Sequence, residues 1–349
     1  HKNKKILLMF YKWIDGVNKG EFPILKSVIH QFSESDLAIV KQDWQIIIDK
    51  IKAGKAHEIS EGDTMYLAAC TKGANAKSMR KQPFSDIPAK QRAYSLKNSY
   101  MTTYVRRILM NEDVISVFKP EELKSKSVDE LLHERFAPYI GRTLYELKRH
   151  INFAENKNKA MYANLVSDLL GIKGTSLDDT EEFAKANIKF KTIRLEPNGV
   201  PREHMSFEQI DFDRWLNASW EESQVYETFE NTKFLFVVFQ FTETERENPN
   251  RVPYLKGIKL WNMPEQIIET ELKNLWQTVH DILAVGVELT QTPRGVKNNL
   301  PGVKFNGVCH IRPKASNAAD KVQLPDGQMI TKQTYWLNRE YIAEIVREL

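Results

Sequence analysis

The chain has 349 residues, of which 42% are hydrophobic and 28% are charged, and its formal net charge is +4. This composition is that of an ordered globular protein, and the length favours two domains. The longest apolar runs have the length of strands, far below the ~20 residues that span a bilayer, and no signal segment opens the chain. We therefore expect no membrane association and a cytoplasmic location.

In the first third of the chain the patterns predict strands, helices and a basic loop. Residues 5–11 read as a buried strand. Ser35 is the expected cap of a helix that ends at Gly54 and has its apolar stripe along Val40 and Trp44. A strand at 65–69, a basic loop at 71–81, a short strand at 94–96 and a helix at 99–109 follow. From Lys72 to Lys97 there are five lysines and two arginines against one acid, so this block has a basic face.

Residues 111–127 are the best linker candidate, because they mix acids, lysines and Pro120 without clear periodicity. Helices are then predicted at 128–151 and 159–170. The alternating pattern at 188–195 predicts a strand with one apolar face and one face that carries lysines, and another strand begins near Phe234. Strands that alternate with helices indicate an α/β or α+β domain with a mixed sheet.

Much of the first block is repeated at the end of the chain. HIRPKASNAA at 310–319 echoes CTKGANA at 70–76, LWQ at 275 answers DWQ at 43, and KQTYWLNREY at 332 answers KQRAYSLKNSY at 90. The order is kept, which predicts two related domains rather than a solenoid. The second copy is preceded by residues 128–230, for which the first has no counterpart, because the sequence begins in mid-pattern and without methionine. Cys70 and Cys309 sit at non-equivalent positions, so we expect neither a disulfide nor a zinc site.

Both copies place cationic side chains directly after a predicted strand, among small residues that let a ligand approach. Such side chains reach phosphates or the guanine edge in a major groove. A solvated turn is the simpler reading of one copy, whereas recurrence favours a binding function. Aromatic residues follow both loops, and in strands these are more often core residues than base contacts. The loop candidates are Arg312, Lys314, Lys72, Lys77 and Arg80, and the aromatic ones are Tyr335, Trp336 and Tyr94.

The strand IKFKTI has the spacing of a metal-dependent nuclease with one change. Such enzymes hold a divalent ion with an upstream acid and a second acid two residues before a lysine. Glu182 (or Glu181) fits the first acid and Lys191 fits the lysine, but Lys189 stands at the second acid. An ammonium has no lone pair for magnesium. The strand is therefore either a solvated amphipathic strand or a nuclease site that has lost its metal ligand.

Together these motifs resemble MutH, the nicking endonuclease of mismatch repair, and the related type II restriction endonucleases that cut at GATC. The motifs are GRTLYEL at 141, LVSDLLGI at 165, EEFAKANIKFKTI at 181, HIRPKASNAA at 310 and TYWLNREYI at 334, with HKNKKILL, DWQIIIDKIKAGK and CTKGANAK in the first block. The resemblance covers essentially the whole chain, as one and a half copies. Two modules in tandem point to the restriction enzymes rather than to the single-module repair protein.

The resemblance implies a fold related to the PD-(D/E)xK nuclease core, with a cleft that clasps duplex DNA. The family's metal acids and catalytic lysine match Glu182, Lys189 and Lys191, so the second acid is lost and no metal is expected there, with Glu182 the one weak candidate ligand. Cys70 stands where the first loop should have its arginine, and the counterpart of Lys2 is Glu230. The DNA-contacting positions of the family match Lys159, Arg312, Lys314, Tyr335, Trp336, Lys72 and Lys2.

From this resemblance we expect residues 1–112 to be the back half of a catalytic module, 113–127 a linker and 128–349 a complete module. The parent enzyme would cut GATC in double-stranded DNA with Mg²⁺. The second module would bind DNA without cutting, as an allosteric effector, and this chain alone would be inactive because the catalytic acids lie upstream of His1. Expected partners are the GATC duplex, the missing N-terminal half, and a DNA-bridged or homodimeric second copy.

Two alternatives remain open at this point. One is a DNA-binding regulator with no connection to cleavage. The other is a second module that still cuts, with Asp178, Asp179 or Glu196 in place of the lost ligand.

Overall fold

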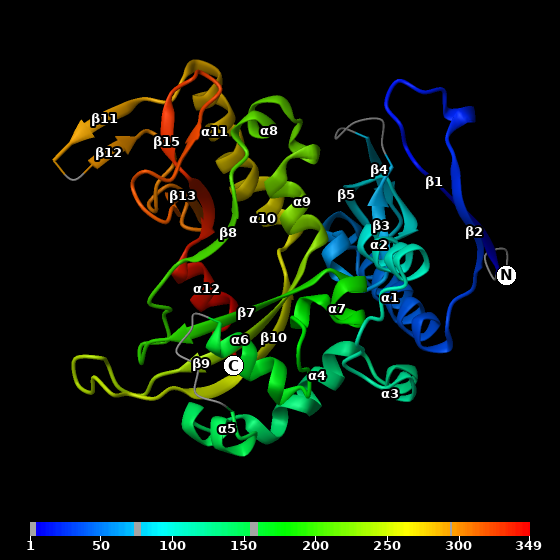
Figure 1. The fold of residues 1–349 in the computed structure, drawn as a ribbon, viewed down its shortest axis with the longest axis horizontal. Helices are drawn as coiled ribbons and strands as arrows, with labels where there is room; N and C mark the ends of the chain where they lie inside the picture. The colour runs from blue at the N-terminus through cyan, green and yellow to red at the C-terminus, as the bar shows by residue number, and fades with distance from the viewer. Residues whose placement is uncertain (1–4, 73–77, 154–159, 294) are drawn as a thin grey trace.

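The computed structural model describes residues 5–72, 78–153, 160–293 and 295–349, and the chain is a mixed α/β protein (Figure 1). Within these ranges every helix is too short or too polar to cross a bilayer. The first block comprises β1 (Ile6–Tyr11), β2 (Ile24–His30), α1 (Glu34–Lys52), β3 (Leu67–Thr71), β4 (Met79–Gln82), β5 (Ser85–Lys90), β6 (Arg92–Leu96), α2 (Asn98–Val105) and α3 (Pro120–Ser125).

The remaining residues build a larger part that lies to the left of the first block in Figure 1. Its elements are α4 (Val128–Phe136), α5 (Leu144–His150), α6 (Met161–Leu169), α7 (Glu181–Ala186), β7 (Ile188–Leu195), β8 (Met205–Gln209), α8 (Phe212–Asn217), α9 (Gln224–Asn231), β9 (Lys233–Gln240), β10 (Tyr254–Asn262), α10 (Glu265–Ile267), α11 (Lys273–Val285), β11 (Leu289–Thr292), β12 (Gly295–Asn298), β13 (Cys309–Pro313), β14 (Lys321–Gln323), β15 (Met329–Thr331), β16 (Gln333–Leu337) and α12 (Arg339–Ile345).

The central sheet has the order β10-β9-β7, with β9 antiparallel to β10 and parallel to β7. Strand β9 is apolar along almost its whole length because both of its faces are buried. Leu235, Val237 and Phe239 face a core shared with α4, α6 and α7, whereas Phe234 and Phe236 face a second core shared with α8, α9 and α11. The sheet is thus sandwiched between two layers of helices, and β7 is held at its edge.

A second sheet, of order β13-β16-β8, carries the second of the two predicted basic loops at the end of β13. We call this loop, which begins with Arg312, Pro313 and Lys314, the RPK loop. The hairpins β11–β12 and β14–β15 extend from the same region and form the upper left arm in Figure 1. The predicted strand at 188–195 is observed with the same bounds as β7.

Two hairpins that are far apart in the sequence have the same geometry. In β1–β2 the pairing skips Leu25 between Ile24, which pairs with Tyr11, and Lys26. In β9–β10 it skips Lys256 in the same way, between Leu255 and Gly257. The hairpins β3–β6 and β13–β16 also match, since each pairs five residues antiparallel in one register.

The prediction of a buried first strand is wrong in its burial. Leu7, Met9 and Tyr11 on one face of β1 are 64%, 52% and 58% exposed. Among the described residues β1 pairs only with β2, so no strand or helix covers that face. The apolar residues of β1 predict burial, whereas in the structure this face of the strand is exposed to solvent.

Helix α1 differs from its prediction at the cap and in its buried face. Ser33 rather than Ser35 is the cap, with its hydroxyl accepting a 3.0 Å hydrogen bond from the backbone N of Asp36. The buried positions include Asp43, whereas the predicted Trp44 is 46% exposed. Asp43 is buried because its carboxylate accepts three hydrogen bonds of 2.7–2.8 Å, from the backbone N atoms of Met65, Tyr66 and Leu67.

The predicted linker is packed structure rather than an extended tether. Phe118 and Leu123, the latter in α3, are only 3% and 5% exposed. The helix predicted at 128–151 is two helices, α4 and α5, separated at residues 137–143, where Gly141 has a φ of +81°. A positive φ is tolerated by glycine and interrupts the helix.

The first block and the larger part share one core. Ile39, Tyr66 and Tyr100 pack in the same cluster as residues of α4, α6 and β9. Ion pairs cross the same boundary: Lys185 lies 3.0 Å from Asp36, and Lys90 lies 2.7 Å from Glu265. The two parts are therefore joined by both apolar and charged contacts.

Candidate nucleic-acid interface

Strand β7 places two lysines on one face, because alternate strand residues share a face. The side chain of Lys189 is 47% exposed, and its Nζ lies 3.9 Å from Oδ2 of Asp178. Lys191 is more buried, with its Nζ 5.3 Å from the ring centre of Phe207. Burial lowers the pKa of Lys191, and the neighbouring Lys314 lowers it further. Two cations therefore lie side by side in this strand.

Glu182 is not brought to these lysines. It is 2% exposed, and its carboxylate accepts a 2.9 Å hydrogen bond from the backbone N of Val117 and another from the hydroxyl of Ser116. Burial raises the pKa of this carboxyl group. The cavity beside Lys189 and Lys191 is lined by Asp178, and Glu182 does not line it. Glu182, which the sequence suggested as a metal ligand, thus holds the segment before α3 by hydrogen bonds.

The carboxylates near β7 do not fit a divalent metal ion. Oδ1 of Asp178 accepts a 2.7 Å hydrogen bond from the backbone N of Phe190, and Oδ2 faces the ammonium of Lys189. Glu196 forms a two-point ion pair with Arg251, whose Nη2 lies 2.7 Å from Oε1. In the part of the chain that the structure describes, no three His, Cys, Asp or Glu side chains are grouped to hold a metal. An ammonium occupies the place where a second carboxylate would be required.

The RPK loop converges on the lysines of β7. Nζ of Lys314 donates a 2.8 Å hydrogen bond to Oγ of Ser206 in β8, and its charge lowers the pKa of Lys191. Arg312 is exposed, and its guanidinium lies 5.7 Å from the ring centre of Trp336. Nε1 of Trp336 donates a 3.2 Å hydrogen bond to the carbonyl of Arg312. The indole therefore fixes the arginine backbone and offers its face to the cation.

The predicted DNA contact by Tyr335 is wrong, because this side chain lies in the core. Tyr335 is 2% exposed and stacks on Phe207 with a centroid distance of 5.7 Å. Its hydroxyl and Oγ1 of Thr228 in α9 are 2.8 Å apart and share a hydrogen bond. Trp336 remains partly exposed, as expected of a residue one position along the same strand.

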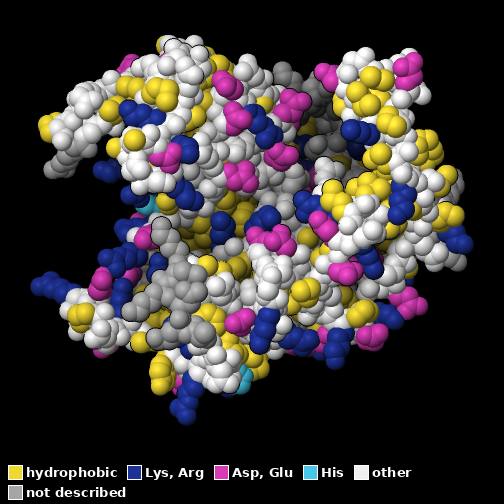
Figure 2. Space-filling model, viewed as in Figure 1, with side chains coloured by type: hydrophobic (Ala, Val, Ile, Leu, Met, Phe, Trp, Pro, Cys, Tyr) yellow, Lys and Arg dark blue, Asp and Glu magenta, His cyan; other side chains and the backbone are white. Residues whose placement is uncertain are grey.

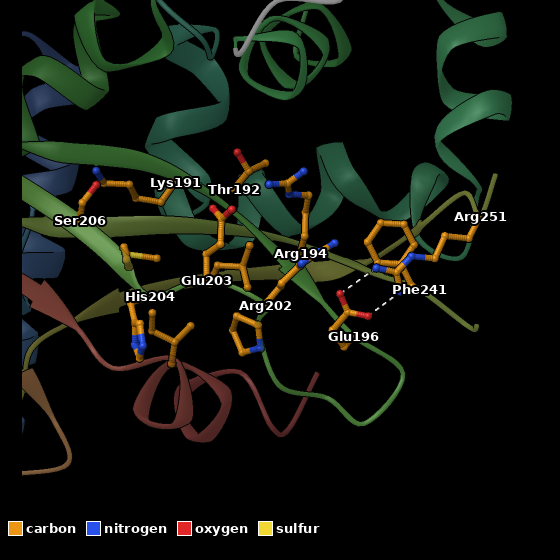
Figure 3. A pocket seen from close by; sticks show the side chains of 14 residues that line it. Lys191, Thr192, Arg194, Glu196, Arg202, Glu203, His204, Ser206, Phe241 and Arg251 are labelled. Atoms are coloured by element: carbon orange, nitrogen blue, oxygen red, sulfur yellow. Dashed lines mark hydrogen bonds and ion pairs between the residues drawn. The ribbon is translucent and has the colours of Figure 1, made fainter. Parts of the chain in front are cut away.

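A further pocket of about 350 Å³ adjoins Lys191 and was not anticipated from the sequence. Figure 3 shows Arg194 of β7 and Arg202 of the following loop around it, with Glu203 and His204 between β7 and α12. In Figure 2, Lys and Arg side chains line the hollow at the left of the molecule. Arg194 belongs to the lysine strand itself, whereas only the fold brings Arg202 to the same pocket.

Some of the DNA-binding candidates of the first block lie within the described residues. Lys72 is exposed at the end of β3, with its backbone N donating a 2.8 Å hydrogen bond to the carbonyl of Gln91, and Tyr94 is 50% exposed. Both are therefore accessible. Lys2, Lys77 and Lys159 lie outside the described residues.

His310, next to the RPK loop, gives a prediction for the pH dependence of stability. It is fully buried, with Nδ1 2.5 Å from Oδ1 of Asn338, and burial lowers its pKa to about 4. The unfolded chain has an ordinary histidine pKa of about 6.5 and so binds the proton more readily between these values. Stability should be full above pH ~6.5 and fall toward pH 4, by at most ~1.4 kcal/mol per pH unit.

The measurement is the free energy of unfolding in urea between pH 7 and 4, for the wild type and for His310→Phe. The variant loses the hydrogen bond to Asn338, so it should be less stable at pH 7, but the difference between the two proteins should shrink as the pH falls. Parallel curves would contradict the assignment to His310.

The chain is similar in sequence to two kinds of known protein. No protein-family model matches the chain. It is 37% identical over 390 aligned residues to the type II restriction enzyme Sau3AI of Staphylococcus aureus, which covers 100% of this chain and 78% of that protein. It is 24% identical over 231 residues to the DNA mismatch repair protein MutH of Actinobacillus pleuropneumoniae serotype 3, covering 64% of this chain and 94% of that protein. The MutH of Vibrio campbellii is 27% identical over 191 residues, covering 54% of this chain and 77% of that protein.

Proposed function

Because this chain belongs to the family of MutH-like type II restriction endonucleases, we propose that it is part of an enzyme that recognises GATC and hydrolyses duplex DNA. Its mixed α/β fold fits the PD-(D/E)xK nuclease group. The observation that carries the proposal is that Lys314 lies close enough to Lys191 to lower its pKa, while Arg312 is exposed two residues before Lys314. Three cations from β7 and from the RPK loop suit a phosphate backbone and the guanine edge.

The part from residue 128 onward binds DNA without cutting it in this proposal. Support comes from Lys189, whose ammonium lies 3.9 Å from Asp178, and from the engagement of Glu182 by Val117 and Ser116. Among the residues that the structure describes, no three His, Cys, Asp or Glu side chains are grouped to hold Mg²⁺, which is the ion that would activate water. The bound module acts as an effector, stabilising the cutting-competent state of a catalytic module.

The chain contains one and a half MutH-like modules, and the half module is completed by a further polypeptide segment. The shared bulge of β1–β2 and β9–β10 supports the duplication. In that correspondence the exposed Leu7, Met9 and Tyr11 match Leu235, Val237 and Phe239, each of which is 0% exposed. The face of β9 that carries these residues packs against α4, α6 and α7, together with residues of the first block. A segment similar to the one that contains these helices would cover β1. The Mg²⁺ ligands belong to that segment.

The test is to incubate the chain with Mg²⁺ and supercoiled plasmid containing GATC, while duplex binding is followed by fluorescence anisotropy. We expect binding without nicking. If the four cations Lys189, Lys191, Arg312 and Lys314 each neutralise a phosphate, affinity should fall on the order of a hundredfold between 50 and 200 mM salt. A duplex lacking GATC is the control for specificity.

A second candidate is a module that still cuts through Asp178, which lies beside Lys189. Nicking at GATC that disappears in Asp178→Asn would favour this candidate and reject the non-cutting effector. Absence of any binding to GATC duplex would reject the DNA-binding proposal itself.

A further inference from the structure

The lysine face of β7 borders a cavity of about 350 Å³ that is open to the cleft. Lys189 and Lys191 line it from the strand, together with three carboxylates, those of Asp178, Glu208 and Glu227. The cavity lies where the second carboxylate of a metal nuclease would stand, two residues before the lysine. Its chemistry is therefore set by an ammonium in that place.

The positive charge of this site is only partly compensated. Oδ1 of Asp178 accepts a hydrogen bond from the backbone N of Phe190. Its Oδ2 lies 3.9 Å from Nζ of Lys189, which is too far for a hydrogen bond. Lys191 has a pKa lowered by burial and by Lys314, which is the electrostatic signature of a cation placed near another cation. Lys314 donates a 2.8 Å hydrogen bond to Ser206, which lines the neighbouring pocket on which Lys191 also borders. Lys189 and Lys191 thus line the cavity, and the charge of Lys314 acts on Lys191 from beside it. Of the three carboxylates in the lining, Glu227 is paired with Arg214, which leaves Asp178 and Glu208 against three ammonium groups.

A phosphodiester supplies the missing negative charge. In a metal nuclease a divalent cation meets the phosphate oxygens at this place, whereas here the cationic charge is covalently attached to β7. We propose that Lys189, Lys191 and Lys314 form a phosphodiester-binding site in which the Lys189 ammonium takes the place of the divalent cation, so that DNA binding needs no metal. The inference rests on the proposed function and adds the ligand group and its independence of divalent ions.

The experiment measures binding of the full chain to a fluorescein-labelled duplex with one GATC, by anisotropy at constant ionic strength, in EDTA and in Ca²⁺. Wild-type affinity should be the same in both within about twofold. Lys189→Glu should bind roughly tenfold more weakly in EDTA, because it removes one phosphate contact and adds a like charge. Ca²⁺ should restore most of that loss, since two carboxylates would then flank the site.

Two further variants sharpen the result. Lys189→Gln removes the charge without adding a ligand, so it should weaken binding in EDTA with no rescue by Ca²⁺. Lys41→Glu, an exposed site on α1, makes the same charge change outside the cleft and should leave the affinity within twofold of the wild type. Unchanged thermal unfolding of Lys189→Glu is expected because its side chain is 47% exposed.

The inference is overturned if the wild type needs Ca²⁺ to bind, or if Lys189→Glu binds as tightly as the wild type in EDTA. Either result would leave DNA binding by the chain intact. A wild type that binds no duplex under either condition would instead reject the proposed function and this inference together.

Discussion

Replacing Arg92 with methionine is expected to lower the free energy of unfolding by roughly 3–5 kcal/mol, because it leaves the buried carboxylate of Glu230 without its cation. The Arg92 side chain is 8% exposed, with Nη1 3.2 Å from Oε1 of Glu230 and Nη2 3.4 Å from Oε1 of Glu265. Burial, followed by the charge of Glu265, raises the pKa of Glu230 well above its ordinary range. Without Arg92, Glu265 keeps its ion pair with Lys90, whereas Glu230 stays buried beside it without a cation.

The pH dependence of Arg92→Met gives the sign of this effect. A carboxyl group whose folded pKa is raised binds its proton more tightly in the folded state than in the unfolded state. The variant should therefore regain stability relative to the wild type as the pH falls and the orphan carboxylate is protonated. Urea unfolding at pH 7.5 and 5.5 measures this, and a loss that is equal at both values would contradict the explanation.

Arg107→Met is the matched control. Its guanidinium is 67% exposed and lies 3.8 Å from Oε1 of Glu181, so this ion pair is screened by water. The expected loss is below ~1 kcal/mol. Adding Glu230→Gln to Arg92→Met should recover part of the stability, which a purely steric effect of the methionine would not allow.

Removing the two cations of the RPK loop is expected to give the largest loss of DNA affinity. Arg312→Ala should weaken binding to a GATC duplex by about 1–3 kcal/mol and relax discrimination against a changed site, if the guanidinium reads a guanine edge. Lys314→Ala should weaken all duplexes alike and reduce the salt slope by about one, as for a phosphate contact. Anisotropy titrations at three salt concentrations separate the two effects.

The exposed Arg347, whose side chain is 76% exposed near the C-terminus, provides the control variant Arg347→Ala. It should change neither affinity nor salt slope by more than about twofold. If Arg312→Ala weakened GATC and altered duplexes equally, the arginine would be a backbone contact rather than a reader of bases.

The sequence predicted those features that depend on local periodicity. The bounds of strand β7 are predicted because apolar and lysine residues alternate there, and β9 is predicted because its apolar run is uninterrupted. The strand β2 was missed because its pairing is interrupted by the bulge at Leu25 and because it remains exposed, so no apolar alternation marks it.

The sequence predicted the lysines of the site and the RPK loop. It did not predict which side chains are buried or hydrogen-bonded by residues far away in the chain. Glu182 has the spacing of a metal ligand, but its carboxylate accepts hydrogen bonds from Ser116 and Val117, about 65 residues earlier in the chain. Tyr335 and Trp336 are neighbours on β16, and the packing of α8 and α9 against one face of the sheet decides which one is buried. The positions of Asp178 and Arg202 likewise depend on the fold.

The shared core has a consequence for how such proteins are recombined. Tyr66 and Tyr100 complete a core otherwise made by later residues, and the ammonium of Lys185 is held by Asp36. A hybrid could join the first block of one relative to the later part of another. Its core would then pack poorly around Tyr66 and Tyr100, and the ion pair between Lys185 and Asp36 could lose a partner. Inheritance of the two parts as a single cassette avoids that defect, so their boundary in the sequence is a poor place for a crossover.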